Sequence, residues 1–164
     1  MRRMSHAARS GDSAGFEESV LIGAAPTRVL AAFFDPHALG QWWQVTRSVT
    51  TPHLMGVFAV EWAPTEHSDD ILGRLGGVFH GTVMEYLPGR ELFVADAWWL
   101  PPDGEPIGPM ALEISCRMSG PVCRLVVKQT GFEDSERWRR YYSVIGAGWR
   151  SSLAALKAYL EESA

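Results

Sequence analysis

A proline-free segment near the C-terminal end of the chain constrains the fold more than any other feature. Between Glu133 and Glu162, large apolar side chains recur in steps of three and four residues, which is the period of one helix face. Asp134, Ser135 and Glu136 provide the cap and the negative charge that favour a helix start. Such a helix is roughly 40 Å long at about 1.5 Å per residue, so it needs a larger apolar partner than a short helix. The stripe consists of Trp138, Tyr142, Ile145, Trp149, Leu153, Leu156 and Leu160.

The remainder of the chain is rich in strand patterns, so the partner expected for this helix is a curved antiparallel sheet. Two short helices should follow the first strand, because Pro26 suits the first turn of one helix and Asp35-Pro36 ends it. Residues 63–74 read as a polar loop. We predict strands at 16–22, 45–51, 56–62, 77–87, 91–100, 110–118 and 122–132. Strands and helices that are segregated in this way indicate an α+β fold.

Length, composition and charge bound the class of protein. The 164 residues fit one domain with a sizeable core, which we expect over 16–164, after a disordered arm at 1–15 that lacks a secretory signal. The net charge of -4, without a long basic run, argues against a nucleic-acid partner. No apolar stretch is long enough to span a membrane, so we expect a cytoplasmic protein. Its seven tryptophans suggest an aromatic-lined interior.

Several short motifs, in their order and spacing, resemble one known family. They are Pro26-Thr-Arg-Val-Leu-Ala-Ala-Phe-Phe-Asp35-Pro36, Leu39-Gly-Gln-Trp42-Trp43, Gly81-Thr-Val83-Met-Glu85, Glu91-Leu92, Thr130-Gly131-Phe132, and Gly148-Trp149 followed by Leu153, Leu156 and Tyr159-Leu160. Over roughly 16–162 the chain resembles the activator-of-heat-shock-protein-90-ATPase-like branch of the START-like (SRPBCC, birch-pollen-allergen-like) superfamily. The resemblance implies a helix-grip fold, in which a sheet of about six to seven strands curls around the terminal helix and encloses a cavity. It implies no single activity, because this superfamily includes carriers, cyclases and hydratases.

Strand parity indicates which side chains should line that cavity, because successive side chains point to opposite faces. On the strand at 91–100 hydropathy barely separates the two faces, and the family resemblance favours Leu92, Val94, Asp96 and Trp98 as inward. A single bulge would reverse this assignment. On the other strands the inward set is expected to include Phe58, Trp62, Phe79, Val83, Glu85, Leu112, Ile114, Leu125, Val127 and Gln129.

Three polar residues belong to the predicted inward sets. A carboxyl group of Glu85 or Asp96 in an apolar cavity would have a raised pKa and could act as an acid or base. The alternative is a carboxylate at the cavity rim, for instance Glu85 paired with Arg90. Gln129 would most simply hydrogen-bond a neighbouring buried group.

The aromatic residues divide between core and cavity wall. Trp138, Tyr142, Ile145 and Trp149 lie on the inward stripe of the long helix. Trp42 and Trp43 end the second short helix near the expected cavity mouth, where one should pack and the other should stay partly exposed. Trp62 and Trp98 are further wall candidates. An exposed tryptophan beside Leu100-Pro101-Pro102 would favour self-association, so a homodimer stays open.

No metal site, cofactor site or nucleophile is predicted. The two cysteines, Cys116 and Cys123, face each other if Ser119-Gly120 forms a two-residue turn, and without a secretion signal we expect reduced thiols. The histidines have no ligand spacing, and no phosphate loop or dinucleotide fingerprint occurs.

The sequence therefore favours binding of a small hydrophobic or aromatic molecule between the long helix and the sheet. The alternative is a small-molecule enzyme of the cyclase, hydratase or hydrolase type that uses Asp96 or Glu85 as acid or base. The family resemblance adds a co-chaperone-like stress protein, although a full chaperone activator would carry a further amino-terminal domain.

Overall fold

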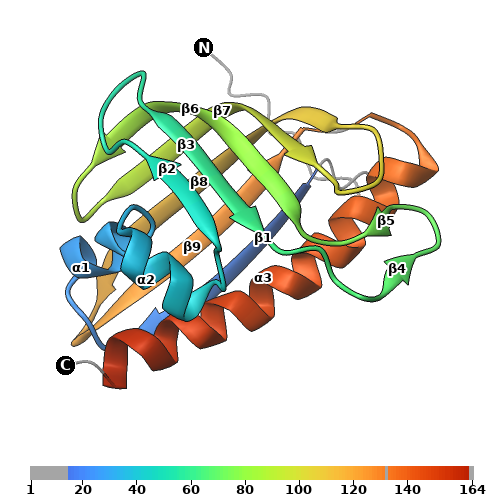
Figure 1. The fold of residues 1–164 in the computed structure, drawn as a ribbon. Helices are drawn as coiled ribbons and strands as arrows, with labels where there is room; N and C mark the ends of the chain where they lie inside the picture. Colours follow the sequence, from blue (N-terminus) through green and yellow to red (C-terminus); the bar gives the residue numbers. More distant parts are fainter. Residues whose placement is uncertain (1–14, 132, 163–164) are drawn as a thin grey trace, which may run out of the picture.

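The long C-terminal helix, α3 (Glu136–Glu162), lies across the concave face of a curved sheet, as its apolar stripe predicts (Figure 1). The computed structural model describes residues 15–131 and 133–162. The sheet has seven strands, β1 (Gly15–Ile22), β2 (Arg47–Thr50), β3 (Val57–Trp62), β6 (Gly77–Leu87), β7 (Glu91–Leu100), β8 (Ile107–Ser119) and β9 (Val122–Thr130). The predicted α+β helix-grip fold is confirmed.

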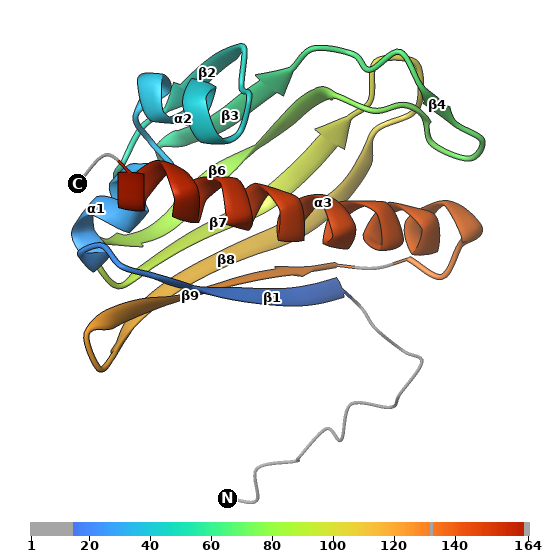
Figure 2. The ribbon, with the colours of Figure 1, turned by 90° about the horizontal axis from the view of Figure 1, so that it is seen from below.

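All neighbouring strands of the sheet are antiparallel, and their order is β1-β9-β8-β7-β6-β3-β2. The first strand therefore returns to pair with the last, and β2 forms the opposite edge. In the view turned by 90° about the horizontal axis, the sheet is curved and α3 runs over its concave side (Figure 2).

Two short helices, α1 (Pro26–Ala31) and α2 (Pro36–Trp42), connect β1 to β2 at one end of this hollow side (Figure 2). Each begins with a proline. Proline has no backbone N–H, and it is tolerated here because an N–H in the first turn of a helix has no intrahelical acceptor. The Asp35 carboxylate caps α2 by accepting from the backbone N–H groups of His37 and Ala38, both at 3.3 Å.

Both ends of α3 are anchored by polar contacts. At its start, the Ser135 hydroxyl accepts a hydrogen bond from the Trp138 N–H at 3.2 Å, which confirms the predicted cap. Near its end, Lys157 donates to the Leu21 carbonyl at 2.8 Å, and Glu161 accepts from the Gly23 N–H at 3.0 Å. The helix is thus held at a defined height and angle over the sheet.

The structure adds one element to the predicted set and shifts several bounds. The segment read as a polar loop at 63–74 contains a small hairpin of β4 (Ser68–Asp69) and β5 (Gly73–Arg74). Strand β8 begins three residues earlier than predicted, and β2 is shorter than the expected 45–51. The predicted arm at 1–15 lies, except for Gly15, outside the described residues, as does residue 132.

Two β-bulges reverse the side-chain parity on adjacent strands. On β7 the register shifts between Val94 and Ala97, and Asp96 has a φ of 49°, in the left-handed region. Asp96 is therefore exposed, Ala97 and Trp99 point inward, and Trp98 is on the outer face. The expected inward orientation of Asp96 and Trp98 is wrong, because the bulge inserts one extra residue.

The second bulge lies on β6, where the register shifts between Val83 and Glu85. Phe79 and Val83 are buried as predicted, but Glu85 is exposed, so its expected inward orientation is also wrong. Tyr86 takes the inward position instead, with its ring 4.6 Å from that of Phe34.

The two cysteines are free and buried on the same face of the β8–β9 hairpin, but they are not directly opposite. Ser119 pairs with Val122, so Gly120 and Pro121 form the turn, Cys116 faces Leu125, and Cys123 faces Met118. The predicted turn was one residue off. Burial raises the pKa of the Cys116 thiol, which keeps it protonated and unreactive.

The left-handed backbone conformation at Asp96 restricts the residue types that this position can hold without strain. Asn shares the tolerance of Asp for left-handed backbone, whereas a β-branched residue does not. We expect Asp96→Val to lower the free energy of unfolding by about 1–2 kcal/mol, and Asp96→Asn to change it by less than about 0.5 kcal/mol. Urea denaturation of both variants measures this, and equal stability of the two would contradict the assignment.

Candidate ligand-binding pocket

A pocket of about 540 Å³ lies between the first half of α3 and the sheet. Its volume falls in the range of small-molecule sites. Among its seventeen lining residues none is Asp, Glu, Lys, Arg or His, and six are aromatic. The lining consists of Trp43, Gln44, Trp62, Ala63, Thr65, Leu72, Leu75, Gly76, Phe79, Trp99, Gln129, Tyr141, Val144, Ile145, Gly148, Trp149 and Ser152.

Contacting aromatic rings from three elements form one wall of the pocket. The Trp43 ring lies 5.0 Å from Trp62 in a T-shaped contact and 4.9 Å from Trp149 on α3. Trp42 stacks on the back of Trp43 at 4.9 Å, so it supports the wall from the core. Edge-to-face and offset contacts of this kind stabilise each ring's position. The wall is therefore in place before any ligand arrives.

The indole N–H groups of this region are used within the protein. Trp62 donates to the Trp43 carbonyl at 2.9 Å, Trp99 to the Gly76 carbonyl at 2.8 Å, and Trp149 to the Gln129 side-chain oxygen at 3.3 Å. These three rings consequently present apolar faces and edges, rather than donors, to the pocket.

The polar groups deepest in the pocket are Gln129 on β9 and Tyr141 on α3. Gln129 is 1% exposed, and its amide N–H₂ donates to the Tyr141 hydroxyl at 2.8 Å and also contacts the Met110 sulfur. The Tyr141 ring stacks on Trp99, with centroids 5.4 Å apart. The expectation that Gln129 bonds a neighbouring buried group agrees with this arrangement.

Burial raises the pKa of both Tyr141 and Tyr142 above the usual value for tyrosine. Tyr142 faces away from the pocket and donates to the Gly131 carbonyl. Both hydroxyls therefore stay protonated at any physiological pH, and Tyr141 can act as a donor but not as a base.

The β4–β5 hairpin covers one side of the pocket and is held by an ion pair to α3. Asp69 accepts from Arg140 at 2.6 and 2.8 Å, and its side chain is only 8% exposed. Its other oxygen accepts from the N–H groups of Ile71 and Leu72, which fixes the tip of the hairpin. Leu72 is thereby turned inward as a buried part of the pocket wall.

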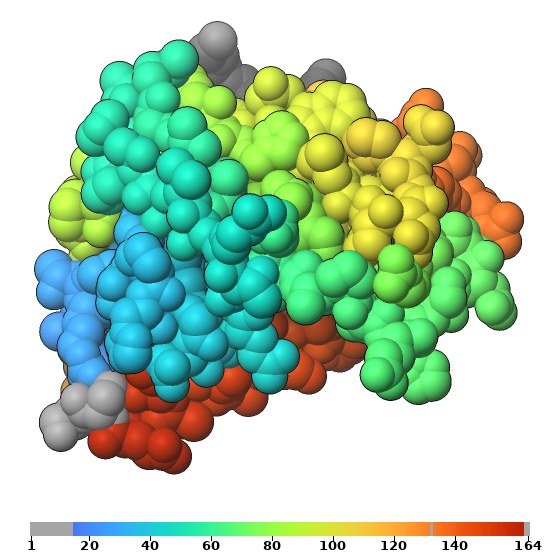
Figure 3. All heavy atoms as spheres, viewed as in Figure 1, coloured from blue at the N-terminus to red at the C-terminus, as the bar shows by residue number. Residues whose placement is uncertain are grey.

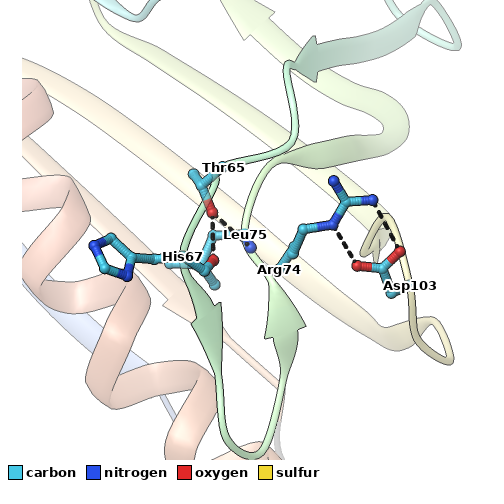
Figure 4. A network of polar contacts seen from close by, with 5 residues as sticks. All are labelled: Thr65, His67, Arg74, Leu75 and Asp103. Atoms are coloured by element: carbon cyan, nitrogen blue, oxygen red, sulfur yellow. Dashed lines mark hydrogen bonds and ion pairs between the residues drawn. The ribbon is translucent and has the colours of Figure 1, made fainter.

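The base of the same hairpin is held by a second network (Figure 4). Arg74 makes two hydrogen bonds to the Asp103 carboxylate, at 2.7 and 3.1 Å. The Thr65 hydroxyl donates to the His67 carbonyl and accepts from the Leu75 N–H. These contacts bring Thr65 and Leu75 to the edge of the pocket.

The pocket opens to solvent between the hairpin side and the end of α2. Gln44, Ala63, Thr65 and Gly148 all line it and are exposed. In the space-filling view, α2 and the hairpin region both lie against α3, whose surface stays visible between and below them (Figure 3). A Cβ atom added at Gly148 would meet nothing within 4 Å, which identifies this helix position as part of the mouth.

Six of the residues predicted for the site line the pocket: Trp43, Trp62, Phe79, Gln129, Ile145 and Trp149. Seven others, Trp42, Phe58, Val83, Leu112, Ile114, Trp138 and Tyr142, are buried core residues outside the lining. The two expected carboxylates and Trp98 lie on the outer face because of the bulges.

Sequence reasoning missed Trp99, Tyr141, Leu72 in the β4–β5 hairpin and Leu75 directly after it. Strand parity places Trp99 on the outer face, whereas in the structure it points inward. The bulge at Asp96 that causes this change leaves no signal in the hydropathy pattern. Tyr141 lies next to the predicted stripe, one residue before Tyr142, and a stripe wide enough to include both tyrosines would have found it. Leu72 and Leu75 were hidden in a segment dominated by polar residues.

Residues 15–131 and 133–162 contain no group of three or more His, Cys, Asp or Glu side chains placed to hold a metal ion. No helix among them is long and apolar enough to cross a membrane.

Comparison with known proteins agrees with this architecture. A family model described as activator of Hsp90 ATPase homolog 1-like protein matches residues 23–161. No curated protein sequence matches the chain.

Several solved structures share the fold at low sequence identity. A protein from Mesorhizobium loti has a TM-score of 0.69 at 19% identity, over 92% of this chain and 98% of its own. The AHSA1 protein from Silicibacter pomeroyi has a TM-score of 0.65 at 19% identity, over 92% and 100%. The Aha1 dimer from Colwellia psychrerythraea has a TM-score of 0.61 at 14% identity, over 90% and 96%. At these identities the likeness concerns the fold alone.

The hairpin ion pair predicts a specific pH dependence of stability. The hydrogen bond from Arg140, with those from Leu72 and Ile71, lowers the pKa of Asp69 from 3.8 to about 2. Because the folded-state pKa is depressed, this contribution is complete above about pH 4 and disappears as the pH falls towards 2. We expect the stability advantage of wild type over Asp69→Asn to shrink across this window in denaturant titrations.

Asp70→Asn is the matched control, since it removes the same charge from the adjacent position. Among the described residues Asp70 accepts no hydrogen bond from Arg140. A difference between wild type and Asp69→Asn that stays constant from pH 5 to pH 2 would contradict the ion pair's role.

Proposed function

We propose that this chain, which belongs to the activator of Hsp90 ATPase homolog 1-like family, binds a small hydrophobic or aromatic molecule between α3 and the sheet. The observation that carries the proposal is the pocket of about 540 Å³ whose lining has six aromatic rings and no charged side chain. Apolar walls supply affinity, and a few placed polar groups set orientation.

Two features support binding rather than a role for the cavity in folding alone. The ring contacts among Trp43, Trp62 and Trp149 hold the wall in position, which lowers the entropy lost when a ligand binds. The mouth at Gly148 and Gln44 gives a route from solvent to the interior.

The geometry does not favour an enzyme based on the two carboxylates suggested by the sequence. Asp96 and Glu85 are exposed on the outer face of the sheet, and neither belongs to the pocket lining. A general acid or base must lie within hydrogen-bond reach of the reacting group. Binding is therefore the better-supported function.

Closing the mouth from the helix side tests the proposal. Gly148→Leu places a side chain in open space at the pocket entrance, and replacing a helical glycine should stabilise the helix by up to about 1 kcal/mol. We expect the variant to melt no lower than wild type and to bind the neutral probe N-phenyl-1-naphthylamine at least about tenfold more weakly, roughly 1.4 kcal/mol. Probe fluorescence and thermal melting measure the two effects.

Ala147→Leu is the control, because Ala147 is an exposed residue of the same helix that does not line the pocket. It should leave probe affinity unchanged. No binding to wild type, or equal binding by wild type and Gly148→Leu, would refute the proposal.

We also propose that the chain forms a homodimer through the outer face of the sheet near β2. The surface beside Leu100, where the sequence suggested self-association, is not the most apolar one. Five large apolar residues with 41 to 68% exposure lie around β2, β3 and β6. They are Val49, Leu54, Met55, Val57 and Met84. A patch of this kind is typical of an interaction surface, and the similar structure from Colwellia psychrerythraea is a dimer.

Light scattering after size-exclusion chromatography tests this assembly. Wild type should elute with the mass of two chains, and Val57→Glu with the mass of one, because a buried unpaired charge opposes the interface. Met118→Glu, at an exposed residue near the end of β8, is the control and should stay dimeric. A wild-type monomer at 100 µM would contradict the proposal.

A further inference from the structure

We infer that the ligand is a flat, uncharged aromatic compound with a carbonyl or similar acceptor oxygen, and that the Tyr141 hydroxyl donates a hydrogen bond to this oxygen. The inference rests on the proposed function and deepens it, because it names the class of molecule and the residue that orients it. Its support is the direction of the hydrogen bonds at the bottom of the pocket.

Hydrogen-bond directions follow from the chemistry of three side chains. The Trp149 indole N–H can only donate, so the Gln129 group that it meets at 3.3 Å must be the amide oxygen. This assigns the orientation of the amide, and its N–H₂ must then point to Tyr141, at 2.8 Å. Tyr141 therefore receives a hydrogen bond through its oxygen, and its own hydrogen has to find another acceptor.

Within the described residues, the acceptor closest to this hydrogen is the Met110 sulfur, at 3.5 Å from the hydroxyl oxygen. A thioether sulfur is a weak acceptor. The hydroxyl thus keeps most of its donor capacity, and it belongs to a side chain that lines the pocket. A ligand oxygen can take this hydrogen without breaking the bond from Gln129, so the exchange loses little protein–protein interaction.

The donor is also permanent, because burial raises the pKa of Tyr141 and keeps the hydroxyl neutral. The remaining lining groups agree with an uncharged ligand. A charged group brought beside Phe79, Trp99 and Trp149 would lose its hydration without an opposite charge to meet it. Stacked and T-shaped ring contacts along the wall favour a flat aromatic skeleton over a flexible chain.

A pair of probes that differ only in the acceptor tests the inference. Fluorene and 9-fluorenone share one flat tricyclic skeleton, and only the ketone carries an oxygen. We expect wild type to bind the ketone about tenfold more tightly than the hydrocarbon, which is the contribution of one buried hydrogen bond. Tyr141→Phe should remove this preference and leave the affinity for fluorene unchanged. Quenching of tryptophan fluorescence gives both affinities.

Tyr142→Phe is the matched control, because the same atom is removed from the adjacent tyrosine, whose hydroxyl donates to the Gly131 carbonyl. It should keep the wild-type preference. The infrared carbonyl band of bound 9-fluorenone gives a second measurement, and it should lie at lower frequency in wild type and in Tyr142→Phe than in Tyr141→Phe.

The possible outcomes distinguish failure of this inference from failure of the proposed function. Binding of both probes with no ketone preference, or with a preference that survives Tyr141→Phe, overturns this inference and leaves the pocket as a binding site. An infrared band that does not respond to loss of the hydroxyl overturns it as well, independently of affinity. Failure of both probes to bind wild type overturns the inference together with the proposed function.

Discussion

The seating of α3 on the concave sheet is the constraint on which the rest of the structure depends. The second half of the helix buries Leu153, Leu156 and Leu160, each of which contributes about 1.5–3 kcal/mol by leaving water. Lys157 and Glu161 add fixed points at the end of β1. The first half of the helix, held at the same height, carries bulky aromatic residues that cannot fill the space beneath them. The pocket lies where this packing is incomplete.

The polar interior of the pocket is set by the requirement that buried polar groups find partners. Gln129, Trp149 and Tyr141 satisfy one another across β9 and α3, so their positions are mutually dependent. A buried network of this kind orders side chains that would otherwise be free to rotate. Its one weakly used group, the Tyr141 hydroxyl hydrogen, belongs to a side chain that lines the pocket.

Long-range ion pairs decide how the pocket is covered. Asp69 and Arg140 are far apart in the sequence, yet their contact places the β4–β5 hairpin beside α3 and turns Leu72 inward. Arg74 and Asp103 hold the other strand of the hairpin. The exposed pair of Arg74 and Asp103 contributes little to global stability. The main effect of both pairs is on position, because they determine which loop covers the pocket.

The periodic parts of the sequence predicted the fold well. The stripe on α3, the cap at Ser135, and the strand bounds at 77–87 and 91–100 all match the structure, because local hydrogen bonding and the period of burial set them. Four of the six aromatic residues of the pocket followed from the same patterns, namely Trp43, Trp62, Phe79 and Trp149.

By itself, the sequence determined the α+β class, the order of the elements and the apolar character of the interior, since these depend on hydrophobic period and on the local preferences of each residue type. Only the tertiary structure decided which side chains meet. The left-handed backbone at Asp96 places Trp99 on the inner face of the sheet and Trp98 on the outer face. The ion pair between Asp69 and Arg140 holds a largely polar segment beside α3, where Leu72 lines the pocket. A bulge shifts parity by one residue without changing hydropathy, and an ion pair between distant residues leaves no periodic pattern. The site therefore depends on contacts that exist only once the chain has folded.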